Sequence, residues 1–202
     1  MKRLIFILLL ACLLTGCAGS VKIKEQKLLF ENGSVCYIPR VKTGNAGLDK
    51  AINGKIKEQI PVFKDDDVLN MGYSAFQNGD MLSVFFEGEV QNDSFFKSLH
   101  INLKNARAYS LKDLILEERL PDFEALVNEE LSINLGQYAI VYKPDVFSAA
   151  FDIADNQLII IFAPGAVAPY DMGFVDAAFD LFDIDELINK NGEMYLVISE
   201  FD

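Results

Sequence analysis

Two Asn-Gly pairs interrupt alternating apolar and polar positions in the first half of the chain. The first pair, Asn32-Gly33, lies between two apolar runs, and the second pair, Asn78-Gly79, precedes the run 81–90. Asparagine and glycine both tolerate the positive φ angles of two-residue hairpin turns. Apolar and polar positions alternate at the start of the run 81–90, which is typical of the centre of an antiparallel sheet. The pattern therefore predicts two β-hairpins.

Other segments carry apolar residues at three- and four-residue spacing, which predicts helices. These segments cover residues 48–60, 111–115, 123–131 and 183–189. Pro121 suits the first turn of the third helix, and Asp183 is expected to cap the last one. Further strands are expected at 95–103, 107–111, 149–154 and 158–162, and a closing strand at 194–199. Asp155-Asn156-Gln157 is expected to turn the chain between two of these strands.

Hairpins with separate helices, rather than regular strand–helix alternation, predict an α+β fold. We expect an antiparallel sheet whose hairpins are packed by separate helices. Phe85-Phe86 and Phe95-Phe96 place adjacent aromatic rings on opposite faces of two strands. One ring of each pair belongs in the core, and the other is expected to pack under a helix. The alternative is an exposed apolar patch for a partner.

The N-terminus combines two basic residues, Lys2 and Arg3, with the apolar run 4–14 and the sequence Leu14-Thr15-Gly16-Cys17. A helix needs about 20 apolar residues to span a bilayer, so this run fits the apolar region of a signal peptide instead. The segment resembles the signal and lipobox of bacterial lipoproteins. The resemblance implies a signal peptide at 1–16, diacylglycerol and a fatty acid such as palmitate on Cys17, a short tether at 17–26, and one domain at 27–202.

A lipidated Cys17 would anchor the protein outside the cytoplasm, because two or three acyl chains hold a protein stably at a bilayer. The expected location is the cell envelope, at the cell membrane or an outer membrane. Ala18 follows the cysteine, where lipoproteins that are retained at an inner membrane have an aspartate. By resemblance to these sorting signals, the chain is not expected to be retained there. Two alternatives remain: a secretory signal that is cut elsewhere, and an anchor that is not cleaved.

The chain is acidic, with 18 Lys and Arg against 30 Asp and Glu and a formal charge of -12. Residues 1–16 contain two basic residues and no acidic one, so their removal leaves 16 against 30, or -14. Such a field repels nucleic acid and anionic lipid headgroups and attracts cationic proteins. We expect no nucleic-acid partner. The charge also has a simpler interpretation, which is solubility.

Cysteine and histidine are scarce. Cys12 leaves with the signal and Cys17 is the lipidation site, so Cys36 would be the remaining thiol, expected as a small buried hydrophobe rather than a reactive group. His100 lies in a strand-like run without a second His or Cys at ligand spacing. It is expected to be a packed or surface residue, and we expect no metal site, no cofactor and no histidine-dependent triad.

Carboxylates are abundant, so chance pairs are expected and abundance does not indicate a glycosidase. The densest cluster, Asp65-Asp66-Asp67, lacks the spacing of a calcium loop and is expected to be a solvated loop. A second acidic stretch lies between Asp176 and Glu186. The chain contains no glycine-rich phosphate loop, nucleophile elbow or CxxC motif. We therefore expect a protein that is not an enzyme.

The C-terminal third shows a strand at 158–162, then Ala168-Pro169-Tyr170, Gly173 and a short helical stretch at 183–187. This order resembles a domain-of-unknown-function family found in the extracellular part of the anti-sigma factor RsiV and beside the deacetylase domain of PdaC. The segment from Tyr37-Ile38-Pro39 into the first helix resembles the family's N-terminal half. The resemblance implies a noncatalytic ligand-binding domain, with lysozyme as one candidate ligand.

The loop around Pro164, Gly165 and Pro169 has two interpretations. It is a rigid connection, because proline and glycine are turn residues. It is alternatively a ligand-contacting loop with Tyr170 as the contacting ring. Together these features predict an envelope-anchored lipoprotein that binds lysozyme or a cell-wall component. The alternatives are a carboxylate-dependent enzyme acting on peptidoglycan and a structural envelope protein.

Overall fold

The computed structural model describes residues 21–64, 66–136 and 144–198. Cys17 lies outside them, so its lipidation stays a prediction. Six strands form the larger sheet in their order along the chain: β1 (Lys22–Leu29), β2 (Val35–Lys42), β3 (Leu69–Asn78), β4 (Met81–Val90), β5 (Asp93–Asn102) and β6 (Ala108–Tyr109). All neighbours pair antiparallel except β2 and β3. Those two are parallel because the helix α1 (Ala46–Lys57) connects them as a crossover.

Both predicted hairpin turns are confirmed. Gly33 has a φ of 85° between β1 and β2, and Gly79 has a φ of 52° between β3 and β4. The turn between β4 and β5 uses Gln91 and Asn92, also at positive φ, and no Asn-Gly pair announced it. A fourth hairpin turns at Asp155 and Asn156, as the sequence predicted.

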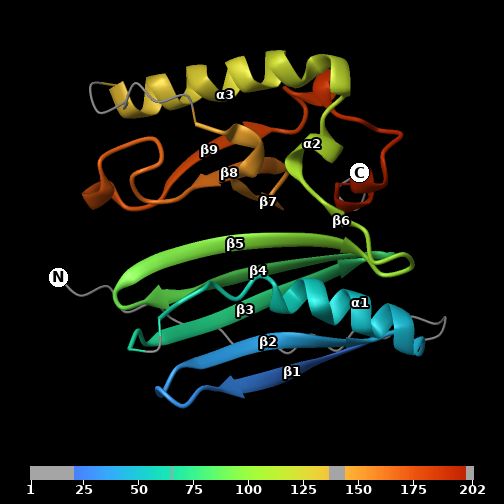
Figure 1. Ribbon diagram of the computed structural model, residues 1–202. Coiled ribbons are helices and arrows are strands. Elements are labelled where there is room, and N and C mark those ends of the chain that lie inside the picture. The colour runs from blue at the N-terminus through green and yellow to red at the C-terminus, as the bar shows by residue number, and fades with distance from the viewer. Residues whose placement is uncertain (1–20, 65, 137–143, 199–202) are drawn as a thin grey trace.

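Helix α1 covers one face of the larger sheet (Figure 1). Its first turn is capped by Asn45, whose side-chain oxygen accepts hydrogen bonds from the backbone N–H groups of Gly47 and Leu48. Ile52 and Ile56, one turn apart, are fully buried against the strands. The predicted helix at 48–60 is therefore confirmed, with both ends shifted toward the N-terminus. The buried members of this first core include Cys36, Ile38, Leu69, Met71, Leu82, Val84, Phe86, Leu99 and Ile101.

A second layer contains the sheet of β7 (Ala150–Ala154), β8 (Gln157–Phe162) and β9 (Val175–Asp180). Helix α3 (Leu120–Leu135) lies on the far side of this sheet from the larger one (Figure 1). Pro121 occupies its first turn, as predicted. The short helix α2 (Leu111–Leu114) connects the layers. A separate core fills the space under α3 and includes Phe123, Val127, Leu131, Phe151, Leu158, Ile160, Phe179 and Met194.

The α+β prediction is confirmed: two sheets, mostly antiparallel, are packed by separate helices. The described residues also contain short 3-10 helices: η1 (Glu117–Arg119), η3 (Val146–Ser148), η4 (Tyr170–Met172), η5 (Asp185–Leu187) and η6 (Glu193–Val197). None of the helices in the described part of the chain is long and apolar enough to cross a membrane.

Three predictions for the two ends of the domain are wrong. The last helix is only the single turn η5, whose N-cap is Ile184, so Asp183 does not cap it. In place of the closing strand the chain forms the 3-10 helix η6, which buries Met194 and the following Ile198 in the core. Strand β1 begins at Lys22, so residues 22–26 belong to the sheet and not to the tether.

The two rings of each phenylalanine pair lie on opposite faces of their strand, as expected. The expectation that a helix covers the second ring is not met for Phe85. Phe86 is fully buried in the core beside α1, whereas Phe85 is buried on the opposite face. There its ring stacks on Phe96 at 6.1 Å between centroids. Aromatic neighbours on the same face of the larger sheet, rather than a helix, therefore pack around Phe85.

Candidate functional site

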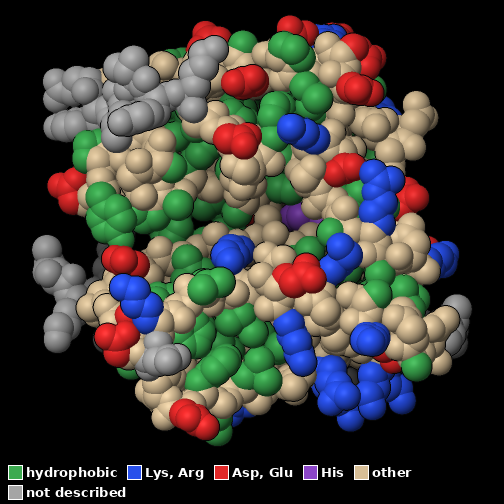
Figure 2. All heavy atoms as spheres, viewed as in Figure 1, with side chains coloured by type: hydrophobic (Ala, Val, Ile, Leu, Met, Phe, Trp, Pro, Cys, Tyr) green, Lys and Arg blue, Asp and Glu red, His purple; other side chains and the backbone are tan. Residues whose placement is uncertain are grey.

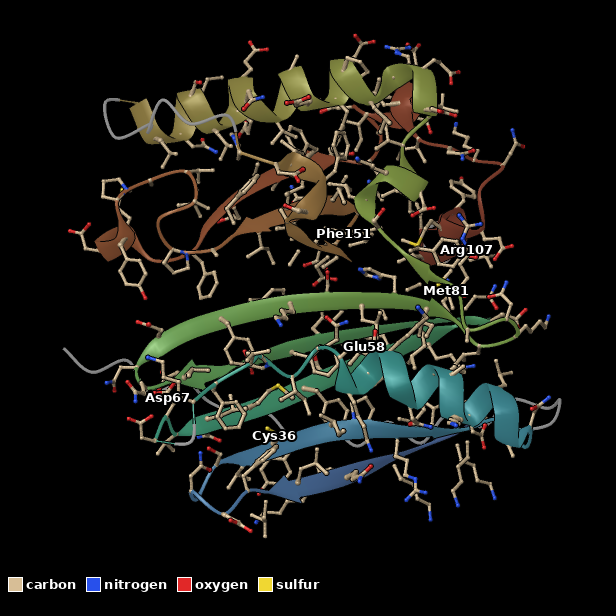
Figure 3. All side chains as sticks on the ribbon, in the orientation of Figure 1. Cys36, Glu58, Asp67, Met81, Arg107 and Phe151 are labelled. Carbon is tan, nitrogen blue, oxygen red and sulfur yellow. The ribbon has the colours of Figure 1, made fainter. Side chains whose placement is uncertain are left out.

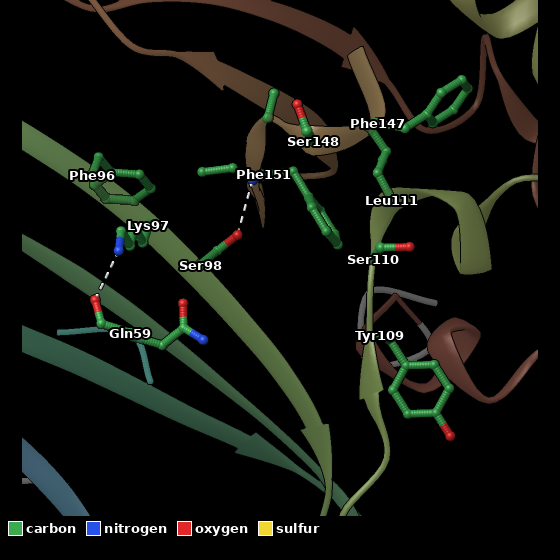
Figure 4. Close-up of a pocket in the computed structure, with 12 residues that line it drawn as sticks. Gln59, Phe96, Lys97, Ser98, Tyr109, Ser110, Leu111, Phe147, Ser148 and Phe151 are labelled. Carbon is green, nitrogen blue, oxygen red and sulfur yellow. Dashed lines mark hydrogen bonds between the residues drawn. The ribbon is translucent and has the colours of Figure 1, made fainter. Parts of the chain in front are cut away.

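A groove lies between β5 and the segment that leads into β7. It consists of two adjoining open hollows of about 330 and 540 Å³. Phe96, Ser148, Ala149 and Ala150 line both of them. The first hollow is completed by Gln59, Lys97, Ser98, Tyr109, Ser110, Leu111, Phe147 and Phe151 (Figure 4). The second is completed by Pro144, Asp145, Ile161, Phe162, Ala163, Gly165 and Ala166.

The groove exists because most of one edge of β5 has no strand partner. In the described residues, β6 pairs with β5 only at His100 and Ile101. β7 approaches this edge without forming a ladder. Instead, the N–H of Phe151 donates to Oγ of Ser98 at 3.0 Å, and His100 Nε2 lies 3.3 Å from the carbonyl oxygen of Phe151. An unpaired edge of this kind is a common place for another chain to bind.

Hydrogen bonds hold two polar side chains of the first hollow, Lys97 and Tyr109, in place. Lys97 Nζ donates to the carbonyl oxygen of Gln59 at 3.0 Å (Figure 4), and burial lowers the pKa of this amine. The hydroxyl of Tyr109 donates a hydrogen bond to Glu193, and burial, followed by the effect of this carboxylate, raises the pKa of Tyr109. The hollow thus presents fixed polar groups beside the rings of Phe96 and Phe147.

The Pro-Gly loop forms a wall of the second hollow. Ala163, Gly165 and Ala166 line it, and Gly165 has a φ of 80°. The ring of Tyr170 does not line the hollow. Its hydroxyl donates to Oδ1 of Asp93 at 2.7 Å, which links the loop to the start of β5. The loop therefore acts as a rigid connection, and it also borders the groove.

His100 is a packed strand residue, which confirms the prediction. It is 1% exposed, and its ring stacks on Phe151 with 4.2 Å between centroids. Because the carbonyl oxygen of Phe151 can only accept, Nε2 carries the proton and the hydroxyl of Ser83 donates to Nδ1 at 2.9 Å. Burial lowers the pKa of His100 to about 4. The imidazole connects the two sheets, and it is not among the residues that line the groove.

The acidic clusters serve local structure. Asp65 lies outside the described residues, Asp66 is exposed, and Asp67 accepts a hydrogen bond from the backbone N–H of Lys64. In the second stretch, Asp180 accepts from the N–H of Phe182, and Asp185 pairs with Lys190. Within the described ranges, no group of three or more His, Cys, Asp or Glu side chains is arranged to hold a metal ion.

Sequence reasoning missed the groove because it depends on how the two sheets meet. Phe96 and Gly165 lie in segments for which a partner contact was an alternative interpretation, but they and Ala149 come from distant parts of the chain that no sequence pattern brought together. One signal was available. Only a few residues separate β5 from the helix start at Ser110-Leu111, too few for a strand that could pair with all of β5.

Comparison with known proteins gives the fold. A DUF3298 family protein from Bacteroides fragilis NCTC 9343 is 10% identical over 86% of this chain and 95% of that chain, with a TM-score of 0.55. A DUF3298 family protein from Pseudomonas aeruginosa PAO1 is 8% identical over 85% and 94%, with a TM-score of 0.52. No family model and no curated protein matches the sequence. The chain therefore shares the fold of DUF3298 family structures.

Proposed function

We propose that this chain is a noncatalytic, lipid-anchored binding protein of the cell envelope, and that its ligand occupies the groove. The observation that carries the proposal is the pair of adjoining hollows along the unpaired edge of β5. Ligand sites in proteins are concave, mostly apolar and supplied with a few fixed polar groups. The first hollow places the rings of Phe96 and Phe147 beside the polar groups of Lys97, Ser98 and Ser110, and the second adds the apolar residues Ile161, Phe162 and Ala163.

The scarcity of carboxylates among the described lining residues favours binding over hydrolysis. Glycoside hydrolysis uses two carboxyl groups that face each other across the scissile bond. Among the described residues of the groove, one side chain is acidic, Asp145, and it is exposed. Asp152, whose pKa burial raises, lies outside the lining. A peptidoglycan-cleaving enzyme is therefore the weaker candidate.

Lysozyme and peptidoglycan fragments are the ligands to test first. The resemblance to the extracellular domain of RsiV implies lysozyme, which is a cationic protein. The part of the chain that holds the groove suits such a partner, because residues 65–202 contain 26 acidic and seven basic residues. Opposite charge speeds encounter in a salt-dependent manner.

Binding is measured by calorimetry with the mature chain from Ala18, at low and at physiological salt. In Ser148→Trp the groove is filled, and we expect at least a tenfold loss of affinity for the ligand that binds. Ser132→Trp is the matched control, because this exposed serine of α3 lies outside the lining of both hollows. Equal loss in both variants would contradict the groove as the site, and no binding of either ligand would remove both candidates.

The lipid anchor has its own test. Cells that express the full chain are labelled with radioactive palmitate, and we expect the label in the protein and the protein in the membrane fraction. Cys17→Ser should lose both. Cys12→Ser is the control, since this cysteine lies inside the proposed signal. Palmitate labelling that persists in Cys17→Ser would contradict the proposed lipidation site.

A further inference from the structure

The charges of the chain are divided between its two parts. Residues 21–64, which contain β1, β2 and α1, carry nine basic and four acidic residues. Most of the acidic residues come later in the chain. The formal charge of -12 therefore hides a local excess of positive charge at the β1 edge of the larger sheet.

Four of these basic side chains form a patch that we name the basic end: Lys22, Lys24, Arg40 and Lys42. Lys22 lies directly opposite Lys42 across the β1–β2 ladder, and Lys24 lies directly opposite Arg40. Alternate residues of a strand share a face, so the four charges project from the same side. All four residues are exposed. Figure 2 shows Lys and Arg side chains gathered at the lower right, below α1.

This arrangement costs stability in the isolated domain. Like charges at directly opposite positions of two strands repel each other. Among the residues that the structure describes, none of the four takes part in an ion pair. A neighbouring carboxylate, Asp49, is engaged by hydrogen bonds from the N–H and hydroxyl of Thr43, and Lys42 adds only a minor electrostatic contribution to its lowered pKa. The basic end therefore lacks a full set of counter-charges within the described protein.

The basic end is also the part of the domain nearest to the proposed anchor. β1 begins at Lys22, five residues after Cys17. Five residues of extended chain reach at most about 18 Å. A domain on so short a tether keeps its first strand close to the bilayer surface. This step rests on the lipid anchorage proposed above.

We propose that the basic end binds the anionic phospholipid headgroups of the membrane that holds Cys17, and so fixes the orientation of the domain. Electrostatic attraction to a membrane falls off within a Debye length of about 8 Å at physiological salt, so charges near the surface outweigh the net charge of the chain. The acidic part is repelled from the same surface. Because the groove lies beyond β5, on the far side of the sheet from β1, this orientation turns the groove away from the membrane (Figure 1).

The test supplies the anchor chemically, so that it succeeds or fails independently of lipidation in the cell. The chain from Cys17 onward is coupled through Cys17 to maleimide lipid in vesicles of phosphatidylcholine, with or without phosphatidylglycerol. Lysine acetylation is then measured by mass spectrometry. We expect Lys22, Lys24 and Lys42 to be acetylated at least about threefold more slowly on the anionic vesicles, and salt should remove the difference. Lys104 and Lys190 should react equally on both.

Two variants separate the basic end from charge in general. Lys24→Glu with Arg40→Glu should abolish the protection of Lys22 and Lys42, whereas Lys104→Glu with Arg119→Glu makes the same change of charge in the acidic part and should preserve it. Unchanged urea midpoints establish that both variants are folded. Equal acetylation on both kinds of vesicle, or protection centred on Lys104, would overturn the proposal. If the full chain is not labelled with palmitate in cells, that result contradicts the proposed lipid anchor and leaves the outcome of the vesicle experiment unchanged.

Discussion

Oγ of Ser83 lies 2.9 Å from Nδ1 of His100, directly across the ladder between β4 and β5. The other ring nitrogen of His100 donates to the carbonyl oxygen of Phe151 at 3.3 Å, in the second sheet. Phe151 thus lies between the two sheets (Figure 3). The neutral imidazole satisfies polar groups of both layers at once, so its protonation should weaken the contact between the sheets.

We expect the stability of the protein to fall as the pH drops from about 6.5 to about 4. Burial lowers the pKa of His100 to about 4, while the unfolded chain keeps the ordinary value near 6.5. Between pH 6.5 and 4, His100 binds a proton in the unfolded state but stays neutral in the native state, and this difference favours unfolding. Above pH 6.5 the contribution is fully present. Integrated over this window, the loss is on the order of 3 kcal/mol.

The measurement is urea unfolding at several pH values, for the unmodified chain and for His100→Gln. Glutamine keeps hydrogen-bonding capacity but does not titrate, so the variant should be less stable at pH 7 and should lose less stability between pH 6.5 and 4. Carboxylates such as Asp152 titrate in both proteins and cancel in the comparison. Parallel pH curves for the two proteins would contradict the assignment.

Gly88 is required by the close approach of β4 to β3. A Cβ at this position would overlap the carbonyl oxygen of Asn70 and come 2.9 Å from Cα of Met71. Both obstacles are backbone atoms, so a strand must move to admit a methyl group. We expect Gly88→Ala to lower the free energy of unfolding by about 3 kcal/mol, as overpacking does in cores.

Gly72 provides a matched control in the neighbouring strand. A Cβ built there meets no atom within 4 Å, so we expect Gly72→Ala to be neutral or to stabilise the protein by about 0.5 kcal/mol through the unfolded chain. Urea midpoints with unchanged slopes give both values. Similar losses in the two variants would show that the approach of β4 to β3 is not what selects glycine.

Local chemistry explains why the larger sheet could be predicted. Asn-Gly pairs and the apolar face of α1 specify their structure within a few residues, and these elements were found with modest errors at their ends. The strand predicted for the C-terminal segment was wrong because contacts with distant residues, not local chemistry, select its structure. Met194 is buried by contacts with a distant core, and that tertiary burial selects a 3-10 turn over the strand that its apolar neighbours suggested.

The groove could not be predicted because no single segment contains it. Phe96 was recognised as one of an aromatic pair, but its exposure to the groove depends on β6 ending after two residues. The Pro-Gly loop was recognised as a rigid turn or a ligand contact, and its small residues do border the second hollow. The Tyr170–Asp93 hydrogen bond links the loop to β5, between residues 77 positions apart, and no local pattern announces such a contact.

Cys36 should be inert in the folded protein. Its side chain is fully buried in the first core, and this burial raises the pKa of the thiol to about 11. At pH 8 the thiolate that reacts with alkylating reagents is therefore about a hundredfold scarcer than in the unfolded chain. We expect the mature chain without Cys17 to resist iodoacetamide until guanidinium chloride unfolds it. Rapid alkylation of the native protein would contradict the buried assignment.

The hydrogen bond from Tyr170 to Asp93 should be visible in the titration of the tyrosine. The ionised carboxylate accepts a hydrogen bond from the protonated hydroxyl and repels the phenolate, so the pKa of Tyr170 lies above its ordinary value of about 10. Asp93→Asn removes the charge, and we expect the pKa of Tyr170 to move back toward 10. The titration is followed by NMR with ¹³C-labelled tyrosine, and Tyr170→Phe assigns the signal.

The same pair tests whether the loop shapes the groove. If the link to β5 holds the loop that carries Ala163 and Gly165, breaking it should increase amide exchange in that loop and weaken ligand binding, while the exchange of β4 stays unchanged. Asp93→Ala and Tyr170→Phe should then have equal effects, and the double variant should add nothing, because each single change already removes the bond. Additive effects would mean that the two side chains act separately, and that the loop owes its position to its own prolines.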